Sequence, residues 1–251
     1  MKHQIYFLGA GPGDPELLTL RAERLLKECQ KVFLPPMYDK TFAELLEGKE
    51  LFVPFEYYFA DLIALIKEQL LTGPVAFLVP GDLTFYSPFQ ALVDALGDLA
   101  LVVPGVGTAN AASALLKKTL DLPGVCSRAV LASPRTLGDG PDAPTMGDLA
   151  APGVSLLIYM NNLPLVDLVG QLREGYGKDV PIALAHRVGL TDEEVIVATL
   201  DTIVAKVGTR DFFNLDTPNP RPALTLILVG ENFTSNAAPT WWDYRRDHIW
   251  K

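Results

Sequence analysis

The chain has 251 residues, 49% of them hydrophobic, and its 30 acidic and 21 basic side chains give a formal net charge of −9 at pH 7. That length accommodates one large domain or two domains of about 120 residues each, with ample apolar residues for packed cores. The acidic balance argues against nucleic acid as the main partner, because contact with phosphates requires a basic face. It does not exclude an anionic small molecule, which needs only local arginines.

Cysteine usage and the N-terminal sequence indicate the compartment. Cys29 and Cys126 have no metal-ligand spacing, so we expect neither a disulfide nor a metal site. The first residues lack the long apolar core of a signal peptide, and no apolar run is long enough to span a bilayer. We therefore expect a cytoplasmic protein that does not enter a membrane.

An apolar run from Ile5 to Leu8 predicts a buried first strand. The turn after it reads Gly9-Ala10-Gly11-Pro12-Gly13-Asp14-Pro15 and combines three glycines, two prolines and one carboxylate. Glycine permits positive φ and close approach of backbones, whereas proline stiffens a turn. A simple strand-to-helix connection needs less special chemistry than this. We therefore interpret the turn as an active-site loop.

A dinucleotide-binding loop is the obvious competitor. That pattern is Gly-x-Gly-x-x-Gly, with an acidic residue about 20 positions later. Counted from Gly9, the sixth position is Asp14, whose charge would repel a pyrophosphate. The sequence Val32-Phe33-Leu34-Pro35-Pro36 places no acidic residue at the end of the second predicted strand. Nicotinamide binding is therefore the weaker interpretation.

Strand-like and helix-like stretches alternate through the first half. A helix is predicted over Thr19–Gln30, with Thr19 as its N-cap and with Leu20, Leu25, Leu26 and Cys29 apolar at helical spacing. The other predicted elements are strands at Lys31–Leu34, Pro74–Val79 and Leu99–Val103, and helices at Ala60–Leu71 and Asn110–Leu116. This alternation predicts a mainly parallel sheet covered by helices.

The turn-rich segment Thr119–Gly124 is the predicted boundary between a domain at 1–120 and a domain at 124–251. Beyond it we predict strands at Ala129–Ala132, Val154–Tyr159, Pro181–Ala185, Val195–Leu200 and Leu224–Val229, a helix at Leu163–Arg173, and loops at Ser133–Thr145 and Gly208–Pro222. These strands are closely spaced, so we expect a mixed sheet. We expect the tail from Thr240, which holds all three tryptophans, to be a docked terminal extension, the alternative being a partner-binding arm.

Three further motifs follow predicted strands. They read Pro80-Gly81-Asp82-Leu83-Thr84-Phe85-Tyr86-Ser87, then Pro104-Gly105-Val106-Gly107-Thr108, then Tyr159-Met160. Ligands in open α/β sheets bind outside the carboxyl ends of the strands, which favours a binding role. Each motif also has a structural explanation, respectively an Asx-type turn, close helix–sheet packing and a core methionine.

In this order, the four motifs resemble the tetrapyrrole (corrin/porphyrin) methyltransferase family, and the resemblance extends from Ile5 to about Phe233. It implies two α/β domains with S-adenosylmethionine in the cleft between them, and a homodimer. The cofactor contacts that it implies fall mainly on the main chain, at Pro12, Pro80, Gly81, Asp82, Gly107, Thr108, Met160, Val188 and Thr225.

The resemblance also implies an acceptor side. Asp14 is the candidate for positioning the macrocycle or taking its proton, although an N-terminal turn cap would explain it too. A tetrapyrrole carries several carboxylates, which arginines bind bidentately. The candidate clamps are Arg21, Arg128, Arg135 and Arg187. His186 could act as a base by its intrinsic pKa, but we expect a structural role for it.

Within the family, Arg135-Thr136 in a Pro-rich loop resembles precorrin-4 C11-methyltransferases of cobalamin biosynthesis. Precorrin-2 C20-methyltransferases, which the segment Phe85–Phe89 resembles, and uroporphyrinogen-III methyltransferases stay open, whereas diphthine synthases usually lack the first motif. Leu83 stands where the family usually has proline, and Gly107 where it usually has Thr or Ser. Leu83 also leaves open a catalytically silent module that binds the cofactor.

Overall fold

The computed structural model describes residues 3–138, 140, 142–215 and 223–249. The chain divides into two compact units. The first unit consists of Met1–Ala111 together with Gly189–Thr191, and the second of Ala112–Val188 together with Asp192–Lys251. The division falls inside a helix, upstream of the predicted boundary at Thr119–Gly124.

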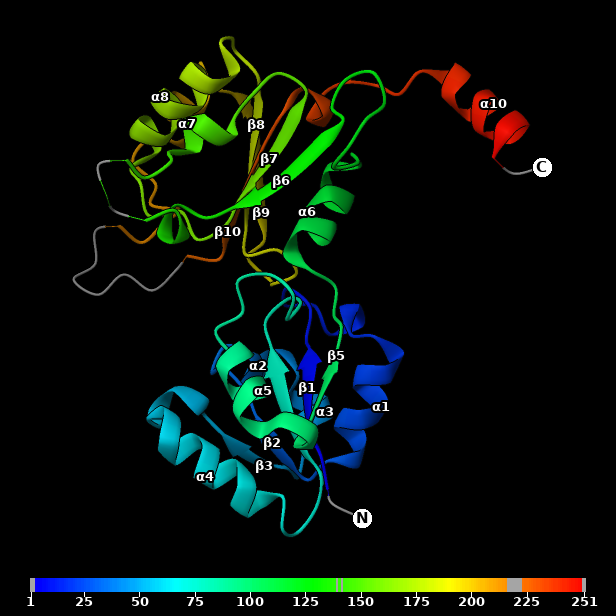
Figure 1. Ribbon diagram of the computed structural model, residues 1–251, viewed down its shortest axis with the longest axis vertical. Coiled ribbons are helices and arrows are strands. Elements are labelled where there is room, and N and C mark those ends of the chain that lie inside the picture. Colours follow the sequence, from blue (N-terminus) through cyan, green and yellow to red (C-terminus); the bar gives the residue numbers. More distant parts are fainter. Residues whose placement is uncertain (1–2, 139, 141, 216–222, 250–251) are drawn as a thin grey trace. The chain divides into compact units, whose positions relative to one another are not determined.

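The first unit contains a parallel sheet of five strands in the order β3-β2-β4-β1-β5 (Figure 1). The strands are β1 (Ile5–Gly9), β2 (Lys31–Phe33), β3 (Glu50–Phe52), β4 (Val75–Val79) and β5 (Ala100–Val103). The helices are α1 (Leu20–Glu28), α2 (Tyr38–Thr41), α3 (Ala43–Leu46), α4 (Phe59–Gln69), α5 (Gln90–Leu96) and the start of α6 (Thr108–Leu116). Three short 3-10 helices are η1 (Pro15–Leu17), η2 (Pro54–Glu56) and η3 (Gly97–Leu99).

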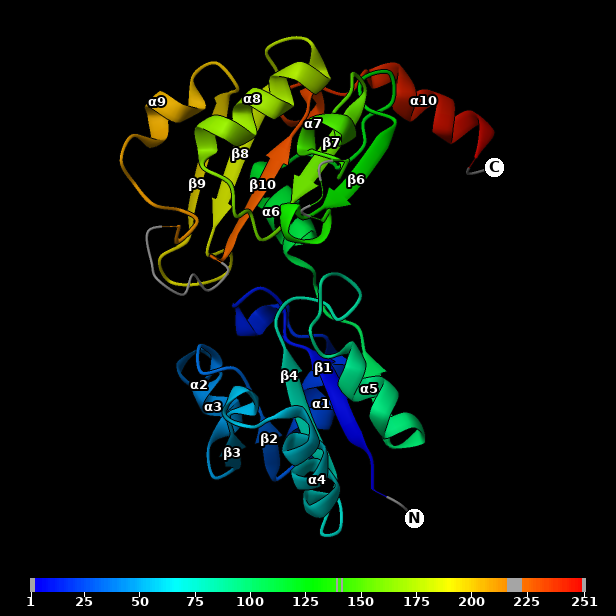
Figure 2. The same cartoon turned by 60° about the vertical axis from the view of Figure 1, so that its left-hand side comes forward.

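Helices cover both faces of this sheet. Alternation along β1 sends Leu8 to one face and Phe7 to the other. Helices α1, α2 and α3 pack on the face of Leu8, where Leu26 and Phe42 join the core. Helices α4 and α5 pack on the opposite face (Figure 2). There Ile66 shares a core with Phe7 and Phe77. Burial on both faces explains why the central strands β1 and β4 are continuous apolar runs.

The second unit contains a mixed sheet in the order β6-β7-β10-β8-β9. The strands are β6 (Arg128–Ala132), β7 (Val154–Ile158), β8 (Pro181–His186), β9 (Glu194–Thr199) and β10 (Thr225–Val229). The remaining elements are α7 (Met146–Leu149), α8 (Leu165–Tyr176), α9 (Ile203–Val207), α10 (Pro239–His248), η4 (Pro134–Thr136) and η5 (Glu231–Phe233). Strands β6 and β7 are parallel, whereas β10 runs antiparallel to both β7 and β8.

One face of the second sheet carries helices α7, α8 and α9, which lie on the same side of the sheet in Figure 2. Leu168 and Leu172 of α8 pack with Ile182, Ile227 and other buried residues of the strands. The prediction of two α/β parts, one with a parallel sheet and one with a mixed sheet, is confirmed.

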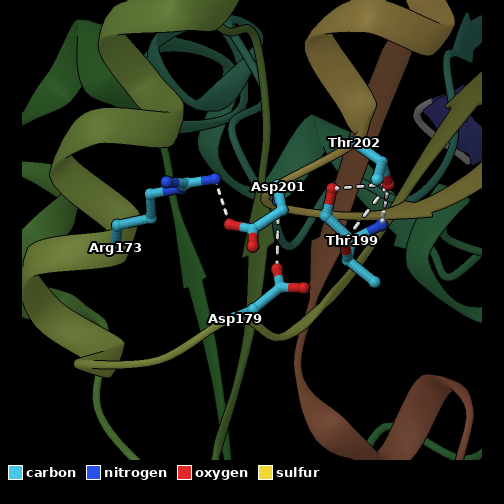
Figure 3. Close-up of polar contacts among 5 residues, drawn as sticks. All are labelled: Arg173, Asp179, Thr199, Asp201 and Thr202. Atoms are coloured by element: carbon cyan, nitrogen blue, oxygen red, sulfur yellow. Dashed lines mark hydrogen bonds and ion pairs between the residues drawn. The ribbon is translucent and has the colours of Figure 1, made fainter.

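Polar contacts hold the turn between β9 and α9 (Figure 3). Arg173 of α8 forms an ion pair with Asp201, and the backbone N–H of Asp201 donates to Oδ1 of Asp179 at 3.0 Å. The backbone N–H of Thr199 donates to Oγ1 of Thr202 at 3.1 Å. These contacts fix the turn to the end of α8 and to the segment before β8.

Several sequence predictions need correction. Leu20 was expected on the apolar face of α1 but is 85% exposed, because it is the first residue after the N-cap and precedes the buried face that starts at Ala22. The tail was expected to dock, yet α10 has no buried residue, and Trp242 is 76% exposed. The predicted loop at 208–222 lies partly outside the described residues, as does Trp250.

In the part of the chain that the structure describes, no helix combines the length and the hydropathy needed to cross a membrane.

Candidate functional site

The loop after β1 is held by a backbone bridge to the loop after β4. The N–H of Gly11 donates to the carbonyl oxygen of Gly81 at 3.1 Å, and the N–H of Gly81 donates to the carbonyl oxygen of Gly11 at 2.8 Å. Both residues have positive φ, +74° and +67°. The left-handed conformation explains why glycine stands at both positions.

The loop after β5 joins the same place through Gly105. A Cβ atom on Gly105 would lie 2.4 Å from the carbonyl oxygen of Gly81 and 2.7 Å from Cα of Gly9. A Cβ on Gly9 would lie 2.4 Å from the backbone nitrogen of Gly105. Only glycines permit this approach, so three sequence motifs meet at the carboxyl ends of β1, β4 and β5. We call these three loops the glycine junction.

Two carboxylates lie on this junction. Asp14 accepts a hydrogen bond from the backbone N–H of Glu16 at 2.8 Å and caps η1, and Asp82 accepts one from Thr84 at 2.9 Å. The sequence also offered a structural role for each carboxylate, as a turn cap or an Asx-type turn. Both roles are present, since each carboxylate forms a local turn of the Asx type. Both side chains are half-buried, and each has a second carboxylate oxygen for other contacts.

The start of α6 lies beside the Gly-Asp loop. A Cβ on Gly81 would lie 3.7 Å from Oγ1 of Thr108, and a Cβ on Gly107 would lie 3.8 Å from Cβ of Asp82. The carbonyl oxygen of Gly107 accepts the first backbone bonds of α6. The predicted cofactor residues Gly81, Asp82, Gly107 and Thr108 are thus neighbours, and Pro12 and Pro80 lie half-buried on the same three loops.

The predicted residues of the second unit gather at one edge of its sheet. Strands β7 and β8 end there, and the antiparallel β10 begins there, with Ile158 opposite Ile227 and His186 opposite Thr225. Met160 follows β7 by two residues and has a φ of +49°. A methionine in the left-handed region stores strain, which is frequent at functional sites.

Two of the predicted arginines lie at this edge. Nε of Arg135 donates to the carbonyl oxygen of Met160 at 3.1 Å, which holds the strained residue. Arg187 has a φ of +52°, and its Nε lies 2.6 Å from Oδ2 of Asp192. Val188, next in the chain, is buried.

The other two predicted arginines lie elsewhere in their units. Arg128 begins β6, at the opposite end of the strand from η4, and its Nη2 donates to the carbonyl oxygen of Pro152 at 3.2 Å. Arg21 is exposed in the first turn of α1. The structure thus groups Arg135 and Arg187 with Met160 but does not group Arg128 with them.

His186 is the residue whose setting the sequence did not indicate. Its Nδ1 lies 2.6 Å from Oγ1 of Thr225, and that hydroxyl donates to the carbonyl oxygen of Phe212 at 2.7 Å. Burial, and next the positive charge of Arg187, lower the pKa of His186. The hydroxyl hydrogen of Thr225 is thus used within the second unit.

Among the described residues, no group of three or more His, Cys, Asp or Glu side chains is arranged to hold a metal ion. Cys29 and Cys126 are buried free thiols.

Comparison with known proteins identifies what this chain is similar to. The family model described as Tetrapyrrole (Corrin/Porphyrin) Methylases matches residues 4–204. A precorrin-4 C(11)-methyltransferase of Pseudomonas aeruginosa is 29% identical over 249 residues, which cover 97% of this chain and 96% of the relative.

Two solved structures share the fold. The structure of a cobalamin biosynthetic enzyme, cobalt precorrin-4 methyltransferase, superposes with a TM-score of 0.75 at 19% identity, over 92% of this chain and 96% of that one. The uroporphyrin-III C-methyl transferase of Thermus thermophilus, complexed with S-adenyl homocysteine, gives a TM-score of 0.65 at 24% identity, over 91% of this chain and 97% of that one.

Proposed function

This chain belongs to the tetrapyrrole (corrin/porphyrin) methylases, and from that premise we propose that it methylates a ring carbon of precorrin-4 or cobalt-precorrin-4, at C11, in cobalamin biosynthesis. The observation that carries the substrate is the similarity to a precorrin-4 C(11)-methyltransferase over almost the whole length of both chains. S-adenosylmethionine is the methyl donor of the family, and the demethylated cofactor in the Thermus thermophilus structure supports its use here.

The glycine junction fits such a cofactor. Its loops present main-chain groups, and Gly81 leaves open the space beside Thr108 that a side chain would fill. We propose that Pro12, Gly107, Thr108 and the backbone of Pro80-Gly81-Asp82 hold the cofactor from the first unit. When bound, S-adenosylmethionine supplies an electrophilic methyl group on a positively charged sulfur. We propose that the carboxylate of Asp82 complements that charge.

Residues at the edge of the second sheet complete the proposal. Met160, Val188 and Thr225 are proposed cofactor contacts, made mainly through the main chain. Arg135 and Arg187 are proposed to bind carboxylates of the macrocycle. Their guanidinium groups already engage Met160 and Asp192, which would fix their orientation before the substrate arrives. Arg21 and Arg128 stay predictions as further clamps.

The chemical task of these residues is mainly orientation. Methyl transfer is an in-line displacement, so holding the acceptor carbon in the line of attack supplies a large part of the acceleration. Asp14, fixed as the cap of η1, is proposed to position the macrocycle. We further propose a homodimer, as the resemblance implies, and a cytoplasmic protein that acts on a small molecule and not on nucleic acid or at a membrane.

Leu83 supports a second candidate function. It stands where the family usually has proline, and it packs against the core of the first unit beside Asp82. A silent module would bind the cofactor without transferring the methyl group. Uroporphyrinogen-III and precorrin-2 are the alternative substrates within the enzyme interpretation.

The deciding experiment offers purified protein S-adenosylmethionine and, separately, precorrin-4, cobalt-precorrin-4, precorrin-2 and uroporphyrinogen-III. Mass spectrometry then detects the addition of one methyl group. We expect addition to a precorrin-4, whereas addition to another acceptor alone would change the substrate assignment. Calorimetric binding of S-adenosylhomocysteine without any methylated product would support the silent module. Binding of NAD in place of S-adenosylhomocysteine would overturn the family-based function.

A further inference from the structure

The hydrogen bonds of Thr225 determine the tautomer of His186. A hydroxyl has one hydrogen to donate, and that of Thr225 goes to the carbonyl oxygen of Phe212 at 2.7 Å. Oγ1 of Thr225 can then only accept at its 2.6 Å contact with Nδ1 of His186. Nδ1 therefore carries a hydrogen, and in the neutral ring Nε2 carries the lone pair.

The surroundings of the ring fix its orientation. The imidazole packs edge-to-face on the ring of Phe212, with centroids 5.1 Å apart and planes at 85°. The guanidinium of Arg210 lies over the ring of Phe212, with its Cζ 5.0 Å from the ring centroid. His186 is half-buried, and its contacts with Thr225 and Phe212 orient the ring.

The charges that act on His186 come from the loop after β8 and from β9. Arg187 is adjacent, Asp192 pairs with Arg187, and Glu194 lies opposite His186 on β9 and pairs with Arg210 at 2.7 Å. The two carboxylates favour the charged imidazolium, but burial and Arg187 outweigh them and lower the pKa of His186. The ring is therefore neutral near pH 7 and free to accept a proton.

The position of His186 connects it to the reaction. It ends β8 at the sheet edge that also carries Met160, Arg135 and Thr225, the residues proposed to contact cofactor and substrate. Because Nδ1 is held by Thr225, a substrate group that approaches the ring meets Nε2 as an acceptor.

We propose that Nε2 of His186 accepts the proton that the tetrapyrrole loses when it is methylated, an inference that rests on the proposed function. Transfer forms one carbon–carbon bond with a π electron pair of the ring. It breaks the carbon–sulfur bond of the donor, whose electron pair stays on sulfur as a neutral thioether. The methylated ring is then positively charged and loses one proton, which Nε2 takes and later releases to water. In this proposal Asp14 positions the macrocycle and does not take its proton.

Two variants separate the two nitrogens. His186→Asn keeps an N–H near the place of Nδ1 but has no base at the place of Nε2, so the bond to Thr225 can persist. We expect kcat to fall about 100-fold or more, with KM for the tetrapyrrole and affinity for S-adenosylhomocysteine changed less than about threefold. His186→Gln places a polar group near Nε2 without basicity and should lose kcat similarly. The matched control is His248→Asn on the exposed α10, with unchanged kcat.

A pH profile and NMR give measurements that a purely structural role of His186 would leave unchanged. Wild-type kcat should rise with pH through the pKa of His186, which lies below its usual value of about 6.5, and the rise should be absent in His186→Asn. Two-bond proton–nitrogen correlations of the imidazole should show hydrogen on Nδ1 in the wild type, and Thr225→Val should abolish that preference. An NMR pKa that differs from the kinetic one would overturn the assignment.

The outcomes distinguish a failure of this inference from a failure of the proposed function. If the wild type methylates a tetrapyrrole and His186→Asn keeps its kcat at every pH, His186 is not the proton acceptor and the proposed function stands. If the wild type transfers no methyl group, the proposed function fails and the proton acceptor with it. Hydrogen on Nε2 in the wild type would refute the geometry directly, whatever the activity.

Discussion

The phenol of Tyr38 donates a hydrogen bond of 2.8 Å to the carbonyl oxygen of Gly11, and both groups are buried. Tyr38 begins α2, so this bond links a helix packed on one face of the first sheet to the backbone of the loop after β1. The same carbonyl also accepts the N–H of Gly81 at 2.8 Å. One oxygen atom therefore joins two of the loops that form the glycine junction to the core.

We expect Tyr38→Phe to lower the free energy of unfolding by about 1 kcal/mol, because the bond is lost while the carbonyl keeps its bond from Gly81. Urea denaturation measures the change. Tyr58→Phe, at a side chain that is 87% exposed, is the matched control and should change nothing. A cost as large as for the removal of a whole core side chain would mean that the phenol supports more than this one bond.

Gly105 and Gly107 give a matched pair, two residues apart. Gly105→Ala should destabilise the fold by about 3 kcal/mol or more, because its Cβ would lie 2.4 Å from a backbone oxygen that cannot rotate away. Gly107→Ser should leave stability unchanged or slightly higher, since its Cβ meets only ordinary contacts and serine caps helices well. Thermal unfolding compares the two proteins, and equal melting temperatures would contradict the packing at the junction.

The strands and the helix caps could be predicted because their signals are local. Buried runs such as Val75–Val79 and Thr225–Val229 are strands as expected, and Thr19 caps α1 by accepting the N–H of Ala22 at 3.1 Å. Elements with weak local signals were missed. Strand β3 has three residues, none of them buried, and α9 has five residues between two turns.

The site could be predicted only where a motif lies within one loop. The turns at Asp14 and Asp82 were foreseen because each carboxylate bonds two residues ahead. The contact of His186 with Thr225 joins residues 39 positions apart and depends on the register of β8 and β10. Spacing along the sequence carries no information about register, so this network needed the structure.

Buried acids should make the protein sensitive to alkali. Burial raises the pKa of Tyr38 and Tyr176 above their usual value of 10.0, and raises the pKa of Cys29 to about 12. Each group is neutral when folded and ionises more readily when unfolded, so its stabilisation is complete below about pH 9 and is lost as the pH rises. We expect urea midpoints to fall between about pH 9 and about pH 12. The fall should be shallower in Tyr176→Phe. An equally steep fall would mean that groups other than Tyr176 cause the loss of stability.

Asp14 can be tested by separating its charge from its cap. Asp14→Asn keeps an oxygen that can accept the N–H of Glu16, so we expect unchanged stability, affinity for S-adenosylhomocysteine within about tenfold, and methyl transfer reduced by about tenfold or more. Asp14→Ala also removes the cap and should cost about 1 kcal/mol in addition. Asp82→Asn is the matched carboxylate on the neighbouring loop, and it should weaken cofactor binding instead. If Asp14→Asn transfers methyl groups at the wild-type rate while only Asp14→Ala loses stability, Asp14 is a cap of η1 and does not position the macrocycle.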